Sequence, residues 1–357
     1  MTSQSIPIAT NWVQKTFLRN TKLPIVYAPS EDKPLDELVQ WIRNHQKEWR
    51  EDLKTYGAVL FRGFPIHEAS DFHKILFATE EKQLGEFYLG TSPRDEVLKH
   101  VFTASELPPH YPIMQHAEMS FLDNPPKLLF FYAEKASDFG GETPLTDLRL
   151  VYKEISPNIK QKIEKHGIKY RRRYDGPSSQ KRFSVWKTKR WDEMFGTTNL
   201  DEVKKIAEKN RFQLDWHGED SLTITNHQSG FRLHPIANTI AWHNHSQTFH
   251  YQAGVSETWK IYKKQKTLRS FGVAFLLTII TIFKRLLGPN SHDVHVTYGN
   301  GEEISPKEMK SISNVFWKHM VAIPWQTGDV LFIDNFSVSH GRLPYTGPRR
   351  ILVGWAD

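Results

Sequence analysis

The segment GDVLFIDNFSVSHGRLPYTGPRRILVGWA, residues 328–356, contains the strongest structural pattern of the chain. Gly328–Asp329 is a turn signal, and the apolar run Val330–Asp334 that follows has the length and composition of a buried strand. His340 comes shortly after a second turn signal, and the β-rich run Arg349–Trp355 closes the chain. The segment therefore predicts strands that carry a histidine between them.

Strand-like and helix-like segments alternate along the rest of the chain, and we expect residues 1–33 to form an extended N-terminal arm. Expected helices lie at 34–56, with Gly57 as C-cap, and at 67–79, 148–166 and 199–210; expected strands lie at 57–64, 128–133, 222–225 and 239–242. Strands spread through the whole length favour an antiparallel barrel with helical insertions. No linker divides the chain, so we expect a mixed α/β fold with a mainly β core in a single domain, 1–357.

Composition excludes several classes of site. The 357 residues include no cysteine, which excludes disulfide scaffolds, thiolate zinc sites and cysteine nucleophiles. Any metal must therefore be bound by His, Asp, Glu and water. The 47 Lys+Arg and 40 Asp+Glu give a net charge of +7 without a basic stripe interleaved with aromatic residues, so we expect no nucleic-acid partner.

Two short patches carry metal-ligand chemistry. Residues 115–121, QHAEMSF, place His116 and Glu118 two apart, and residues two apart on a strand face the same side. With the distant His340 they form two imidazoles and one carboxylate, the facial triad of non-haem iron(II), whose open face accepts a co-substrate and O2. The chain has 17 histidines, and the similar pair His217 and Glu219 lies among polar turn residues, where we expect a surface loop.

The patches occur among motifs that resemble the taurine dioxygenase (TauD/TfdA-like) family of iron(II)- and 2-oxoglutarate-dependent oxygenases, and within it the syringomycin-biosynthesis hydroxylase (SyrP-like) branch. The matching motifs are GAVLFRGF (57–64), GTSPR (90–94), MQHAEMSF (114–121), GGETPLTD (140–147), GDVLFIDN (328–335) and HGRLPYTGPRRILVGWA (340–356). The resemblance implies a double-stranded β-helix, a jelly-roll core surrounded by helices. It also implies that His116, Glu118 and His340 bind iron in an enzyme that uses 2-oxoglutarate and O2.

The resemblance further implies residues for the co-substrate. Arg350 matches the family arginine that pairs with the distal carboxylate of 2-oxoglutarate, a role that suits a planar guanidinium on a closing strand. Arg349 then points to the opposite face of that strand. Thr143, in GGET, matches a hydroxyl donor to the same carboxylate; the alternative is a turn residue after two glycines.

The substrate is less well specified. The SyrP-like resemblance implies hydroxylation of a small amino-acid-like substrate, free or bound to a carrier protein, in a biosynthetic pathway; desaturation or ring closure would need the same metal ligands. We expect Arg94 either to bind a substrate carboxylate or to stabilise a loop. We expect His245 to face the substrate, to support the metal site or to have a structural role. Arg342 is expected in a core ion pair. Rival interpretations are a zinc hydrolase with the same triad and a non-catalytic ligand-binding barrel.

One apolar segment departs from the family pattern. Phe271–Phe283, FGVAFLLTIITIF, lies in an insertion or lid at 269–290 and is too short to cross a bilayer. We expect a helix packed on the barrel or on a second copy in a homo-oligomer; the alternative is a surface that enters lipid. Residues 1–20 lack the apolar region of a signal peptide, so we expect a cytoplasmic protein without a transmembrane span.

Overall fold

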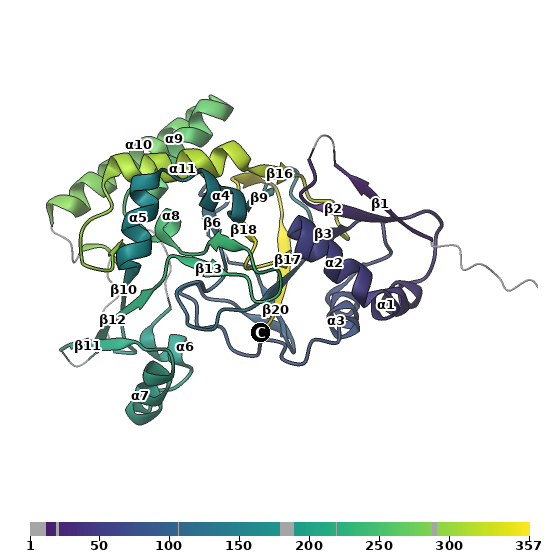
Figure 1. Cartoon of the computed structure of the whole chain (residues 1–357), viewed down its shortest axis with the longest axis horizontal. Helices are drawn as coiled ribbons and strands as arrows, with labels where there is room; N and C mark the ends of the chain where they lie inside the picture. The colour runs from purple at the N-terminus through teal and green to yellow at the C-terminus, as the bar shows by residue number, and fades with distance from the viewer. Residues whose placement is uncertain (1–11, 19–20, 106, 179–188, 219, 288–290) are drawn as a thin grey trace, which may run out of the picture.

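Two facing β-sheets form the centre of the protein in a computed structural model, which describes residues 12–357 except 19–20, 106, 179–188, 219 and 288–290 (Figure 1). The larger sheet has the strand order β1-β2-β3-β17-β7-β20-β5-β4, and the smaller sheet has the order β16-β9-β18-β6. The strands of the larger sheet are β1 (Val13–Phe17), β2 (Ile25–Pro29), β3 (Ala58–Phe61), β17 (Val330–Asp334), β7 (Leu128–Lys135), β20 (Arg350–Ala356), β5 (Val101–Thr103) and β4 (Glu96–Leu98).

The smaller sheet carries the histidine patches. It consists of β16 (Val321–Ile323), β9 (Thr143–Asp147), β18 (Val338–Arg342) and β6 (Ile113–His116). One apolar core lies between the sheets and includes Phe131 and Ile333 from the larger sheet and Leu145 from the smaller one. This arrangement is the jelly-roll core of a double-stranded β-helix, in a mixed α/β fold, as the sequence predicted.

Three helices cover the outer face of the larger sheet: α1 (Leu35–Asn44), α2 (Gln46–Tyr56) and α3 (Ala69–Ala78). Their apolar residues pack with the outward side chains of the sheet in a second core. The helix expected at 34–56 is divided at His45, and it ends at Gly57 in the left-handed conformation (φ 81°), as the sequence predicted.

The remaining elements form a layer beyond the smaller sheet. A four-stranded sheet has the order β11-β12-β10-β15, with β10 (Ile168–Tyr174), β11 (Gln213–His217), β12 (Ser221–Gln228) and β15 (Val294–Tyr298). Two short pairs add β8 (Phe139–Gly140) with β19 (Tyr345–Thr346) and β13 (Phe231–Leu233) with β14 (Ile240–Trp242). The helices are α4 (Leu148–Glu154), α5 (Pro157–His166), α6 (Trp191–Phe195), α7 (Leu200–Lys209), α8 (Ser246–Phe249), α9 (Ala253–Gln265), α10 (Leu268–Leu286) and α11 (Pro306–His319).

The described part of the N-terminal segment is extended and is part of the larger sheet, because β1 and β2 pair antiparallel and β2 joins β3. One further expectation about element boundaries was wrong. The helix expected at 148–166 is two helices, α4 and α5, because Pro157 cannot continue a helix and begins a new one instead.

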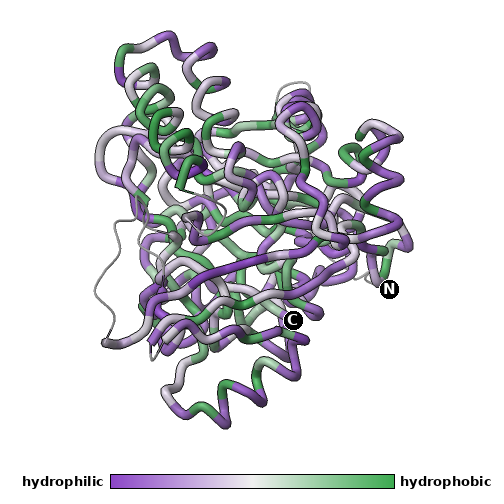
Figure 2. Tube along the Cα trace, turned by 90° about the vertical axis from the view of Figure 1, so that its left-hand side faces the viewer, coloured by the Kyte–Doolittle hydropathy of each residue, from purple (hydrophilic) through white to green (hydrophobic). Residues whose placement is uncertain are grey.

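The apolar segment is a helix, as expected, but its main packing partner is another helix. α10 pairs with α9 at the edge of the molecule remote from α1–α3 (Figure 1). In Figure 2 the pair is seen at the upper left, where the strongly hydrophobic coil lies at the periphery. Within the described residues, no helix combines the length and apolar character that crossing a membrane requires.

Candidate active site

The three predicted metal ligands meet at one point of the smaller sheet. His116 is the last residue of β6, and it lies opposite His340 of β18 in the antiparallel ladder. The ligand atoms of His116, Glu118 and His340 all lie within 4.8 Å of one another. Phe131 of the larger sheet packs on the His340 ring, at 5.1 Å between centroids, so the cluster faces the space between the sheets.

Glu118 reaches the two histidines through a turn, and not through the strand alternation that the spacing of two residues indicated. β6 ends at His116, so Glu118 does not reach the site through strand alternation. A turn follows the strand, and Met119 adopts a left-handed conformation (φ 50°). Asn335 holds the turn: its Oδ1 accepts from the Glu118 backbone N at 2.7 Å, and its Nδ2 donates to the Glu118 carbonyl at 2.9 Å.

The imidazoles are prepared to bind a cation. Nδ1 of His116 donates to the Met114 carbonyl at 2.8 Å, which leaves the Nε2 lone pair for a metal. Burial, together with the neighbouring His340, lowers the pKa of His116 to about 4, so the ring is neutral at neutral pH. Nδ1 of His340 is buried without a protein partner within the described residues. A neutral His116 ring with its Nε2 lone pair available fits a metal-binding role.

Glu118 supplies the charge. Its carboxylate is buried, which opposes ionisation, but the Arg94 guanidinium and the adjacent histidines hold its pKa well below the usual range. Arg94 Nη2 lies 2.8 Å from Oε2, and the Tyr88 hydroxyl donates to Oε1 at 3.0 Å. Two imidazoles and one carboxylate gathered at one point are the donor set of a non-haem iron(II) centre.

The two arginines of the closing strand lie the other way round from the expectation. Arg350 is on the outer face: its side chain is 53% exposed and its Nε forms an ion pair with Glu134 at 2.9 Å. Arg349 is the more enclosed of the two, although it is only partly buried, and its Nε donates to the Gly141 carbonyl at 3.1 Å. The physical reason is alternation: Ile351 and Val353 face the core between the sheets, which directs Arg350 outward, and a bulge in the β20–β7 ladder falls between Arg350 and Ile351.

Arg349 has the properties of an anion site. Burial, with a smaller contribution from Arg342, lowers its pKa to about 10. Thr143 begins β9 two residues after Gly141, is buried, and accepts a hydrogen bond from the Trp325 indole at 3.1 Å. The Thr143 hydroxyl proton is thus free to be donated elsewhere.

The other candidate residues divide between the site and the scaffold. Arg94 contacts the Glu118 carboxylate directly and stacks on Tyr88 at 4.0 Å. His245 lies beside the site, with its ring 5.2 Å from that of His116 and its Nδ1 2.6 Å from the Ser120 hydroxyl.

Arg342 forms no core ion pair with a carboxylate in the described part of the chain. It donates instead to the carbonyls of Leu107, Pro108 and Tyr111, so it is a structural residue that ties the end of β18 to the segment before β6. His217 ends the exposed strand β11, remote in sequence and contact from the triad, and Glu219 lies outside the described residues.

Sequence reasoning missed two residues that support Glu118. Tyr88 is separated from it by 30 positions, and nothing in the local sequence connects them. Asn335 stands in the quoted motif GDVLFIDN, directly after a buried strand, and an amide at a strand end is the signal that could have identified it.

Three comparisons with known proteins agree with this geometry. The family model "Taurine catabolism dioxygenase TauD, TfdA family" matches residues 20–355. The dapdiamide synthesis protein DdaC of Enterobacter agglomerans is 30% identical over 336 residues, which cover 93% of this chain and 90% of that protein. A clavaminate synthase-like protein of Arabidopsis thaliana is 29% identical and covers 98% of this chain and 96% of its own.

A solved structure shows the same fold. PvcB from Pseudomonas aeruginosa superposes with a TM-score of 0.52 at 12% identity and covers 99% of this chain and 95% of its own. A second structure of PvcB, described as an Fe, α-ketoglutarate-dependent oxygenase from an isonitrile synthetic pathway, gives a TM-score of 0.53 at 11% identity.

A jelly-roll core with a His-Glu-His cluster between its sheets defines the class of non-haem iron oxygenases. The chain belongs to the TauD/TfdA family. It is a 2-oxoglutarate-dependent dioxygenase whose cofactor is iron(II) and whose co-substrates are 2-oxoglutarate and O2.

Proposed function

We propose that the enzyme hydroxylates a C–H bond of a small amino-acid-like substrate, free or carrier-bound, in a biosynthetic pathway. One O2 and one 2-oxoglutarate are consumed; one oxygen atom enters the product hydroxyl and the other enters succinate, with release of CO2. Bound iron(II) supplies the O2 activation that this reaction needs. Desaturation and ring closure remain alternatives with the same ligands.

His116, Glu118 and His340 are the residues that we propose as iron ligands. Three protein ligands leave the opposite side of the ion open for the co-substrates. Because Glu118 occupies one of these positions with a carboxylate, the site favours hydroxylation over halogenation, which needs that position for a halide.

Arg349 and Thr143 are proposed to hold the distal carboxylate of 2-oxoglutarate. Support comes from the partly buried guanidinium of Arg349 and the free hydroxyl proton of Thr143. A partly buried cation that has no ion pair with a carboxylate among the described residues is stabilised when an anionic ligand arrives. Arg350, which the motif spacing favoured, already pairs with Glu134 on the exposed face.

Arg94 carries the substrate proposal. Its side chain is 5% exposed, and its Nε and Nη1 have no hydrogen-bond partner among the described residues, although it lies against the metal-ligand carboxylate. Unsatisfied buried donors are costly, and a substrate carboxylate would satisfy both of them. Such a contact would also fix which substrate carbon faces the iron. His245 is proposed to line the same space.

The pathway context rests on a relative. DdaC is named for dapdiamide synthesis. This supports a small-molecule substrate; the SyrP-like branch, the carrier protein, a homo-oligomer and a cytoplasmic location stay predictions.

The experiment is a screen for succinate release with iron(II), 2-oxoglutarate and air. Free amino acids are tested first, and the same acids loaded on a carrier protein second, with a mass increase of one oxygen atom in the product as the second readout. Stimulation by a member of either set supports the proposal. Turnover only with a lipid, a sulfonate or a nucleic-acid base would overturn the substrate class and leave the iron chemistry intact.

The role of Arg94 is separated from folding by variants. Arg94→Gln should raise the substrate KM while 2-oxoglutarate is still decarboxylated slowly without substrate. Arg190→Gln is the matched control, because that arginine is 45% exposed and pairs with Asp192 at the surface. An unchanged substrate KM in Arg94→Gln would show that this residue only supports Glu118.

A further inference from the structure

Helix α10 presents its large apolar side chains to solvent. Eight of them are between 40% and 90% exposed: Leu268, Phe271, Phe275, Leu276, Ile279, Ile282, Phe283 and Leu286. At 3.6 residues per turn they fall within an arc of about 140° on one side of the helix. Isolated exposed apolar residues are ordinary, but a continuous apolar face of this length is not.

The opposite face of α10 fixes this orientation. Ser270, Ala274 and Leu277 are its buried residues, two of them small. Thr278 accepts a hydrogen bond from the Trp259 indole of α9 at 3.0 Å. The helix is therefore attached to the protein through its smaller, more polar side, which is the reverse of an ordinary amphipathic surface helix.

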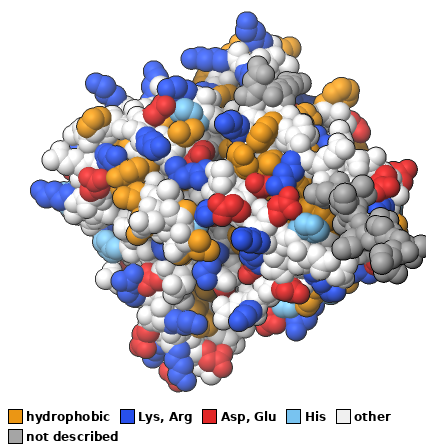
Figure 3. Space-filling view, turned by 45° about the vertical axis from the view of Figure 1, so that its right-hand side comes forward, with side chains coloured by type: hydrophobic (Ala, Val, Ile, Leu, Met, Phe, Trp, Pro, Cys, Tyr) orange, Lys and Arg blue, Asp and Glu red, His pale blue; other side chains and the backbone are white. Residues whose placement is uncertain are grey.

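The charge around this face has one sign. Between residues 258 and 292 the chain has seven Lys or Arg residues and no Asp or Glu. Lys263, Lys264, Lys266 and Arg269 lie exposed at one end of the apolar face, and Arg285 lies exposed near the other. By contrast, blue and red side chains interleave over the face of the molecule shown in Figure 3.

A second copy of this chain is a poor partner for the face. A two-fold interface would bring the two acid-free, basic segments together, and like charges in contact oppose association. An anionic partner complements the surface. Apolar side chains in a plane, flanked by Lys and Arg at both ends, are the pattern of a helix that lies in the interface of an anionic bilayer.

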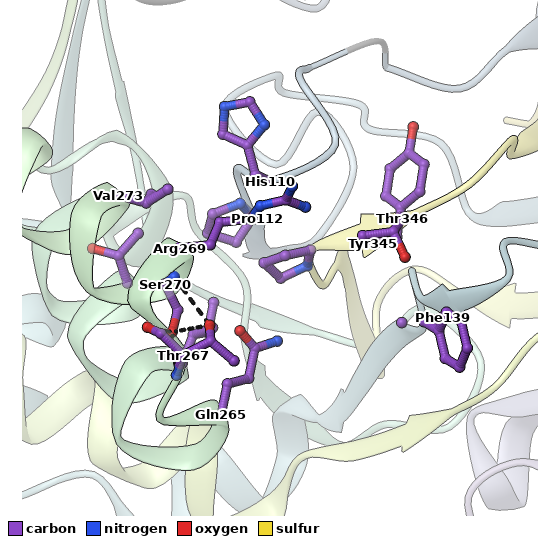
Figure 4. Close-up of a pocket in the computed structure, with 14 residues that line it drawn as sticks. His110, Pro112, Phe139, Gln265, Thr267, Arg269, Ser270, Val273, Tyr345 and Thr346 are labelled. Atoms are coloured by element: carbon purple, nitrogen blue, oxygen red, sulfur yellow. Dashed lines mark hydrogen bonds between the residues drawn. The ribbon is translucent and has the colours of Figure 1, made fainter.

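A cavity opens beside the first turns of α10. It has a volume of 490 Å³ and lies between the ends of α9 and α10 and the β8–β19 pair. Figure 4 shows Arg269 and Val273 on the helix side, with Phe139 and Tyr345 across the hollow. Phe139, on the far side of the cavity from α10, is 77% exposed.

We propose that α10 is a membrane-docking helix that lies parallel to an anionic lipid surface, with its apolar face in the interface and Lys263, Lys264, Lys266, Arg269 and Arg285 against the lipid headgroups. The helix docks the enzyme without spanning the bilayer. This role is independent of the substrate that the iron site accepts.

The test is sedimentation of the full chain with phosphatidylcholine vesicles, with and without phosphatidylglycerol. We expect binding to the anionic vesicles that weakens as NaCl is raised. The double variant Phe275→Asp/Ile279→Asp should lower the bound fraction about tenfold or more, because it places two charges in the apolar face. Uncoupled succinate formation should be unchanged, which shows that the iron site is intact.

The control is a second double variant, Leu200→Asp/Ile236→Asp, at apolar positions that are 52% and 78% exposed elsewhere on the surface. It should bind vesicles like the unaltered chain. Three results would overturn the proposal. The chain could bind neither kind of vesicle, or the α10 variant could bind vesicles as well as the unaltered chain does. The chain could also form a dimer in solution that the α10 variant disrupts and the control variant does not, with no binding to vesicles. Capture of an acidic carrier protein through α10 in place of vesicles would overturn it as well.

Discussion

Substitution of two neighbouring residues, Arg349 and Arg350, tests which arginine binds the distal carboxylate of 2-oxoglutarate. Arg349→Gln removes a partly buried guanidinium beside Gly141, which a bound 2-oxoglutarate would cover, and Arg350→Gln removes an exposed one that pairs with Glu134. Both changes delete one positive charge and keep a side chain of similar length. A difference between them therefore reports position rather than net charge.

The expected magnitudes follow from burial. Loss of one partner of a buried, hydrogen-bonded charge pair costs about 2–5 kcal/mol, which is a factor of about 30 or more in affinity. An exposed ion pair contributes about 0–1 kcal/mol, or at most about fivefold. The 2-oxoglutarate concentration for half-maximal turnover should thus rise about 30-fold or more in Arg349→Gln and at most about fivefold in Arg350→Gln.

Succinate formation against 2-oxoglutarate concentration is the assay, at saturating iron(II) and in air. Iron stoichiometry and thermal midpoint of each variant show whether the fold and metal centre persist. The Arg349→Lys variant keeps the positive charge. If it retains part of the 2-oxoglutarate affinity that Arg349→Gln loses, the loss is due to charge rather than packing. Equal effects of the two glutamine variants, or a larger effect at Arg350, would refute the assignment and restore the motif-based choice.

Three further predictions concern the metal centre and the buried histidines. His116→Ala and His340→Ala should each abolish activity and lower bound iron, measured by metal analysis after gel filtration; full iron content in either would contradict the ligand set. The unaltered enzyme should form hydroxylated and no chlorinated product in chloride buffer, because Glu118 occupies the position that a halide needs; a chlorinated product in the mass spectrum would refute this. Burial lowers the pKa of His243 and His250 to about 3, so the unfolded chain binds more protons and stability should fall below about pH 6.5. The free energy of unfolding falls by up to about 1.4 kcal/mol per pH unit for each histidine. The thermal midpoint should therefore be lower at pH 5 than at pH 6.5, and the difference should be smaller in His250→Asn. A thermal midpoint that does not change with pH would disprove this prediction.

Local signals in the sequence were enough to predict several core strands and to select the three side chains that the structure brings together. A metal-binding triad needs particular residue types, and His116, Glu118 and His340 can be recognised from the sequence by their type and spacing. β17 occupies Val330–Asp334, the range that the turn signal and the apolar run predicted. The C-cap at Gly57 was equally local, because a left-handed residue at a helix end favours glycine.

Glu118 does lie beside His116 and His340, but the strand alternation from which we expected this is not the cause. Spacing of two indicated a strand, whereas the structure uses a turn after β6 that Asn335 holds from 217 positions away. The contact of Arg94 with Glu118 is likewise a product of folding, because no sequence period connects residues 24 apart in different loops.

By itself, the sequence determined which residues are the candidates for iron binding, because residue type and strand propensity are properties of single residues and short runs. Only the tertiary structure decided which of Arg349 and Arg350 faces inward and which side of α10 faces solvent. The first depends on strand register beside a bulge, where a shift of one residue reverses every side chain. The second depends on packing against α9, since periodicity locates an apolar face but cannot say whether protein or solvent lies beyond it.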